Sequence, residues 1–135
     1  MIQRIQSIYL LLPVVLNAMV FYSPIYRHGF ADPSMWIGYT LALSLTAAMV
    51  GSLAAIFLFR SRSLQLSVVK VVTYIQIVAL GAACGVLFSL GGFGSFLLTE
   101  TVSTGLIVLS LMFFWLAGVA IKKDMELVES MDRIR

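Results

Sequence analysis

Charge is what this sequence lacks most. Only 11% of its 135 residues are charged, whereas a soluble domain carries about 25%. Hydrophobic residues make up 61% of the chain. A water-soluble globule of this size leaves too much of its surface exposed to hide so many apolar side chains. The composition therefore predicts a protein whose solvent is a lipid bilayer.

Residues that carry catalysis or bind cofactors are also scarce. Cys84 is the single cysteine, so the chain can form neither an internal disulfide nor a dithiol redox pair. His28 is the single histidine, and we interpret it as a solvated loop residue rather than a haem ligand. No phosphate-binding glycine loop, nucleophile–base set or metal-ligand spacing is found. We therefore expect no enzyme activity, no cofactor and no metal site.

Four long runs contain no charged residue, at positions 8–25, 35–59, 71–90 and 102–121. Each is long enough to cross a hydrocarbon core of about 30 Å as a helix. Lipid cannot hydrogen-bond to open backbone groups, which favours helices. The sequence predicts an all-α, integral membrane four-helix bundle. It forms a single domain over 1–135, with helices at about 7–25, 35–60, 66–91 and 100–130.

The first run has the length of a signal peptide, with Arg4 in front of it. Its exit reads FYSPIYRHGF and offers no small-x-small cleavage site. We interpret this run as a retained transmembrane helix.

The basic residues predict the orientation. Eight of the nine lie on the N-terminal flank, the second connection or the tail, and Arg27 alone lies in the first connection. In a chain that crosses the membrane four times, the N-terminal flank, the second connection and the tail lie on the same side. The positive-inside rule assigns that side to the cytoplasm. We expect a multi-pass protein of the bacterial inner membrane with both termini cytoplasmic. The net charge of +3 is then a topology signal, not a nucleic-acid footprint.

Small residues at four-residue spacing predict close helix packing. Gly51 and Ala55 lie in the second run, and Gly81 and Gly85 lie in the third. Such spacing lets helix backbones approach each other in lipid. We expect these residues to form a seam between the second and third helices. A dimer face or a docking face for a larger protein would show the same spacing.

Polar residues inside the spans have two interpretations. Asn17 lies four residues after Pro13, which should bend the first helix. Gln76 lies in the third span. Hydrogen bonds between helices are the favoured role for both amides, and contacts with a ligand are the alternative.

The connections carry turn and capping signals. Asp32 or Ser34 is expected to cap the second helix, and Thr99 or Glu100 is expected near the start of the fourth. The segment GGFGSF before the fourth helix is favoured as a tight turn. A short re-entrant piece is left open as the alternative.

The tail, 121–135, holds four of the nine basic residues and four of the six acidic ones. No glycine or proline interrupts 119–135. We predict that the fourth helix continues about 20 Å beyond the membrane, with Glu129 and Arg133 paired across one turn. An amphipathic helix lying flat on the membrane is the alternative. Four acidic residues argue against it, because an anionic leaflet would repel them.

The two ends of the chain, MIQRIQSIYLLL and AIKKDMELVESMDRIR, resemble those of the Bacteroidota four-helix membrane proteins grouped as a domain of unknown function, DUF 4293. Met125 stands where that pattern has an acidic residue. The resemblance implies a four-helix inner-membrane protein and carries no activity. It implies that the cytoplasmic surface is the working surface, formed by Arg4, Gln6, Lys122, Lys123, Asp124, Met125, Val128, Met131, Arg133 and Arg135.

The favoured function is a small non-enzymatic subunit, surrounded by membrane lipids, that docks onto a larger inner-membrane complex for export, respiration or envelope biogenesis. The alternative is a small carrier or channel, as a single chain or a homodimer. A lipid-binding or lipid-modifying role comes third, since no nucleophile supports it. The sequence identifies neither a nucleic-acid partner nor a small-molecule substrate. A carrier would need polar side chains converging on a cavity, with candidates Asn17, Gln76, Thr73, Ser110 and Tyr74.

Overall fold

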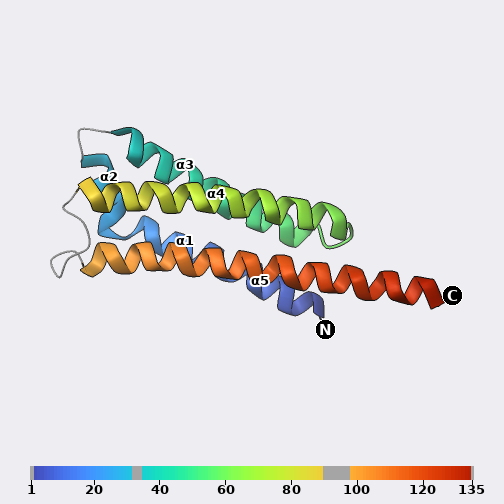
Figure 1. The fold of residues 1–135 in the computed structure, drawn as a ribbon. Coiled ribbons are helices and arrows are strands. Elements are labelled where there is room, and N and C mark those ends of the chain that lie inside the picture. Colours follow the sequence, from blue (N-terminus) through green and yellow to red (C-terminus); the bar gives the residue numbers. More distant parts are fainter. Residues whose placement is uncertain (1, 32–34, 90–97, 135) are drawn as a thin grey trace.

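The computed structural model describes residues 2–31, 35–89 and 98–134. Within these ranges the chain forms helices and no strand. The helices are α1 (Ile2–Phe21), α2 (Pro24–Ala31), α3 (Met35–Phe57), α4 (Arg62–Ser89) and α5 (Leu98–Ile134) (Figure 1). All except α2 are long and apolar enough to cross a membrane. The predicted all-helical architecture with four membrane-length helices is confirmed.

The first predicted span divides into two helices. α1 ends at Phe21, and the short helix α2 begins at Pro24. Proline suits the first position of a helix because the backbone donor it lacks would have no partner there. The backbone N–H and the hydroxyl of Ser23 both donate to the Val20 carbonyl, which closes the last turn of α1. Most of α2 therefore lies in a stretch that the span pattern predicts as a connection.

Other boundaries shift by a few residues. α3 ends at Phe57, three residues before its predicted end, and α4 begins at Arg62, four residues before its predicted start. α5 begins at Leu98, so Glu100 lies in its first turn, as predicted. Its continuation to Ile134 confirms the predicted continuous tail helix. The proposed cap of the second helix and the choice between a turn and a re-entrant piece fall at 32–34 and 90–97, outside the described residues.

α1 lies along α5, and α3 and α4 form a hairpin whose α4 arm packs on α5 (Figure 1). We call the end of the bundle where α1 begins and the 58–61 connection lies the terminal end, and the opposite end the α2 end. Gln6 Nε2 donates to the Ala120 carbonyl at 3.4 Å, so the start of α1 lies beside the later part of α5. α5 projects past the other helices at the terminal end (Figure 1).

The core forms two clusters along the bundle. One includes Ile25, Leu87 and Ile107, and the other includes Leu10 and Phe114. Only 28–39% of each membrane-length span is buried inside the bundle. The rest of each span presents apolar side chains outward, as a lipid environment requires.

α3 packs tightly against α4 at Gly51. A Cβ atom there would overlap the Cγ2 methyl group of Val72 on α4. A Cβ atom at Gly85 would lie in ordinary contact with Ile37 Cγ2, at 3.6 Å, and Ala55 is fully buried. These residues lie in helix contacts, as the small-residue pattern predicts.

The prediction that Gly81 lies in the seam between α3 and α4 was wrong. Gly81 is exposed, and a Cβ atom there would meet nothing within 4 Å. The buried face of α4 runs through Gln76, Ala79 and Ala83. Gly81 is two residues from both Ala79 and Ala83, and a helix places such a residue on the opposite face. Four-residue spacing alone does not identify which face packs.

Replacing Gly51 with alanine is expected to destabilise the bundle by about 1–3 kcal/mol, the usual cost of overpacking. The Val72 side chain is β-branched and cannot easily rotate away. The measurement is the free energy of unfolding in mixed detergent micelles. Gly81→Ala is the matched control and should be neutral or stabilising, because alanine favours helix over glycine. Val72→Ala should restore most of the loss in Gly51→Ala, and an equal loss at both glycines would contradict this packing.

Candidate functional site

The terminal end carries an ion pair between α4 and α5. Arg62 Nε lies 3.1 Å from Asp124 Oδ2, and Asp124 is buried. The same oxygen has no hydrogen-bond partner, so the N–H does not point at it and the contact is a charge pair. It fixes the first turn of α4 against α5 where the bundle ends.

Two residues predicted for the cytoplasmic docking surface therefore lie inside the bundle. Asp124 faces Arg62, and Gln6 is buried and donates a hydrogen bond to the Ala120 carbonyl. The prediction that both are free for docking was wrong, because their polar groups hold helices of this chain together. For Asp124, a signal was present in the sequence: it lies three residues after Ile121 on the apolar stripe of the fourth span.

The inward face of α5 follows a heptad repeat. Residues at alternating spacings of three and four are all buried, and spacing of this kind keeps them on one face. The buried series is Glu100, Ser103, Ile107, Ser110, Phe114, Ala117, Ile121 and Asp124.

The same spacing continues beyond the bundle to Val128 and Met131. Their exposure rises to 39% and 69%, and the neighbouring Leu127 is 53% exposed. We call Leu127, Val128 and Met131 the tail stripe. It continues the core-facing side of α5 past the place where the other helices end (Figure 1). An apolar surface with the spacing of a helix-packing face is thus left uncovered by the described part of the chain.

The other predicted surface residues divide by burial. Met125 is half-buried against the core cluster that contains Phe114. Arg133 is exposed and pairs with Glu129 at 3.3 Å, as predicted. Arg135 lies outside the described residues. The remaining exposed members are Arg4, Lys122 and Lys123.

A buried amide pair crosses the middle of the bundle. Asn17 Nδ2 donates to Gln76 Oε1 at 3.1 Å, and Gln76 Nε2 donates to Asn17 Oδ1 at 3.0 Å. Gln76 Nε2 also lies 3.4 Å from the Ile107 carbonyl, so the pair joins α1, α4 and α5. Both side chains are fully buried. Their hydrogen bonds are the interhelical contacts that the sequence favoured.

The five carrier candidates do not converge on one cavity. Asn17 and Gln76 satisfy each other, and Ser110 and Thr73 donate to carbonyls of their own helices. Tyr74 is exposed on the outer face of α4.

The segment of α1 before Pro13 receives a hydrogen bond from α3. Pro13 removes a backbone donor, so the Tyr9 carbonyl loses its usual partner one turn earlier. The Ser52 hydroxyl donates to the next carbonyl, that of Leu10. Hydroxyl groups of neighbouring helices commonly satisfy backbone groups near proline in membranes.

His28 lies in α2 and not in a solvated loop. Its Nε2 atom is 3.3 Å from Glu100 Oε1 in the first turn of α5. The sequence interpretation of a loop position was wrong, because His28 lies in α2, while its side chain is 43% exposed. Among the described residues, no group of three or more His, Cys, Asp or Glu side chains is placed to hold a metal ion.

Four membrane-length helices with outward apolar faces define a helical, multi-pass membrane protein. The sequence pattern of a family described as a domain of unknown function, DUF4293, matches residues 2–134. The chain belongs to this family, as the motifs at its two ends indicate. No curated protein and no solved structure matches the chain.

Replacing either member of the amide pair with leucine is expected to cost about 1–2 kcal/mol of unfolding free energy. Each single variant leaves one buried amide with fewer partners. The double variant Asn17→Leu/Gln76→Leu should cost less than the sum of the singles, because it leaves neither amide behind. Unfolding in mixed micelles measures all three. Thr73→Val, which removes a bond within one helix, is the control, and additive single effects would contradict coupling.

Removing the charge of Asp124 is expected to destabilise the terminal end more than removing that of Glu129. Asp124→Asn should cost about 1–2 kcal/mol, between the values for exposed and buried pairs. Glu129→Gln breaks an exposed pair within one helix and should cost under about 0.5 kcal/mol. Thermal unfolding in neutral detergent at low salt compares the two. Equal effects would show that the Arg62–Asp124 contact contributes no more than a surface pair.

Proposed function

We propose that this chain is a non-enzymatic subunit of a larger complex in a bacterial inner membrane, and that the tail stripe docks it there. The observation that carries the proposal is the break in burial along one face of α5. Asp124 is buried, whereas Val128 and Met131, which follow it on the same face of α5, are exposed. A partner helix laid against this face would extend the packing of the bundle.

The orientation supports a protein partner for the stripe. Eight of the nine basic residues belong to the segments at the terminal end, and the positive-inside rule favours the cytoplasm for that end. A helix that projects there meets water, where exposed Leu127 and Met131 are unfavourable. The Glu129–Arg133 pair balances charge on the tail, so the stripe has the apolar centre and polar rim of an interface.

The size of the stripe supports a partner within the membrane. Residues 125–134 span only about 15 Å of helix, which is too little for a standard interface burying about 1,600 Å². Additional contact must come from the outward faces of the spans. These faces are apolar and exposed over most of their area. A membrane complex supplies both surfaces, whereas a soluble cytoplasmic protein reaches only the tail.

A carrier or channel has less support. Its candidate polar residues satisfy one another, bond within their own helices or face outward. No single observation on the described residues favours a transport path.

The test compares variants of the tail at native expression level. Val128→Ser/Met131→Ser is expected to release the protein from a large assembly, seen by native electrophoresis after mild detergent extraction. Glu126→Ala/Ser130→Ala, on the other side of the same helix, should leave the assembly intact. Unfolding of the purified variants checks that the bundle itself is unchanged.

A cross-link then locates the partner. In a Cys84→Ser background, Met131→Cys is expected to form a discrete adduct in native membranes, and Glu126→Cys is expected to form much less of it. If the mildest detergent extracts the wild-type chain from native membranes as a free monomer, the proposal is contradicted. An assembly that stays intact in the Val128→Ser/Met131→Ser variant would also contradict it.

A further inference from the structure

A groove opens between α4 and α5 toward the terminal end of the bundle. Its volume is about 340 Å³. Gly118 leaves it hollow, because the nearest atom to a Cβ placed there is Val69 Cγ1, at 3.9 Å. Val69 and Phe114 belong to the core and form its floor. The groove is thus a shaped depression on the outside of the bundle.

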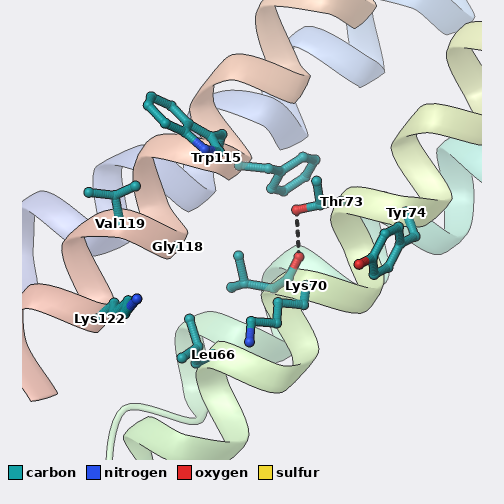
Figure 2. Close-up of a pocket in the computed structure, with 10 residues that line it drawn as sticks. Leu66, Lys70, Thr73, Tyr74, Trp115, Gly118, Val119 and Lys122 are labelled. Carbon is teal, nitrogen blue, oxygen red and sulfur yellow. Dashed lines mark hydrogen bonds between the residues drawn. The ribbon is translucent and has the colours of Figure 1, made fainter.

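Two lysines line this groove, one from each wall. Lys70 comes from α4 and Lys122 from α5, and no acidic residue lines the groove with them. Figure 2 shows both side chains at the same end, with the Lys70 ammonium group turned toward Leu66 and away from Thr73. Over the described residues, neither lysine makes an ion pair.

Lys70 lies farther along α4 than Arg62, just before the uncharged run 71–90, and it is exposed. It lies eight residues, or about 12 Å, along α4 from Arg62. A cation beside apolar walls is costly in a membrane, and a long lysine side chain reduces the cost by reaching toward the membrane surface. A second cation, Lys122, at the same end raises the cost further. An anion placed between the two ammonium groups would lower it.

The rest of the groove is apolar and open to lipid. Trp115 lies on the α5 side, about 10 Å deeper than Lys122, and Tyr74 lies on the α4 side (Figure 2). Both rings are exposed. This stretch offers an apolar surface along which a hydrocarbon chain can lie.

We propose that this groove binds one anionic phospholipid from the leaflet at the terminal end. The phosphate lies between Lys70 and Lys122, and an acyl chain follows the groove past Gly118 toward Trp115. Basic pockets between transmembrane helices recognise anionic headgroups in this way. A zwitterionic lipid brings its own cation to the same place, and a free phosphate leaves the apolar walls uncovered.

Trp115 provides the probe. In a Trp36→Phe background it is the sole tryptophan, and lipids brominated on their acyl chains quench it on contact. The full-length protein is titrated in neutral detergent with brominated phosphatidylglycerol or with brominated phosphatidylcholine of matched chains. We expect about tenfold tighter binding of phosphatidylglycerol, the size of effect that two lysines near a membrane surface supply.

Three variants separate the site from general charge attraction. Lys70→Gln/Lys122→Gln is expected to reduce the preference to less than about twofold. Lys123→Gln removes an exposed charge next to Lys122 but outside the groove lining, and should keep the preference. Gly118→Leu keeps both lysines and fills the groove, and should weaken binding of both lipids. Equal losses in the Lys123 and double-lysine variants, or no loss with Gly118→Leu, would overturn the site.

Inorganic phosphate distinguishes the source of the anion. It is expected to compete poorly, because it cannot use the apolar walls, and full competition at millimolar concentration would overturn a lipid site. The measurement uses purified protein without a partner. A negative result for lipid binding would therefore say nothing about whether the tail stripe docks onto a partner.

Discussion

The structure depends on one constraint, which is that a hydrocarbon solvent offers no hydrogen bonds. Polar groups inside the spans must find partners within the chain. The amide pair of Asn17 and Gln76 meets this requirement between helices, and Ser52 meets it by donating to the Leu10 carbonyl near Pro13. Lipid also removes most of the hydrophobic drive between helices, so close fit must replace it. Gly51 provides that fit where α3 meets Val72 of α4.

Features set by local sequence were predictable. The four spans follow from the length of uncharged apolar runs, and the unbroken tail helix follows from the absence of glycine and proline in 119–135. The break between α1 and α2 is also set by local sequence, because Pro24 occupies the first position of α2, where proline is favoured. Which face of each helix points inward was harder to predict. Gly81 shows that small-residue spacing does not identify the face.

The placement of Asp124 and Gln6 shows why the site was predicted only in part. Both are polar, and both lie in the segments that carry the family motifs, so the family resemblance favoured a free surface. Their roles depend on which residues of α4 and α5 lie opposite them, which is a property of the assembled bundle. The exposed remainder is smaller than predicted and better defined. It includes the apolar tail stripe and exposed basic residues, among them Lys122 at the groove between α4 and α5.

The unbroken course of α5 has a mechanical consequence. Its 37 residues make a rod of about 55 Å with no internal proline to act as a joint. Near one tip Glu100 contacts His28, and near the other Met131 stands clear of the bundle. The contact between Asp124 and Arg62 lies where the packed part of α5 ends and the projecting part begins. The projecting part of α5 is therefore joined to the packed part by one continuous helix, with no proline to open its hydrogen-bond ladder between them.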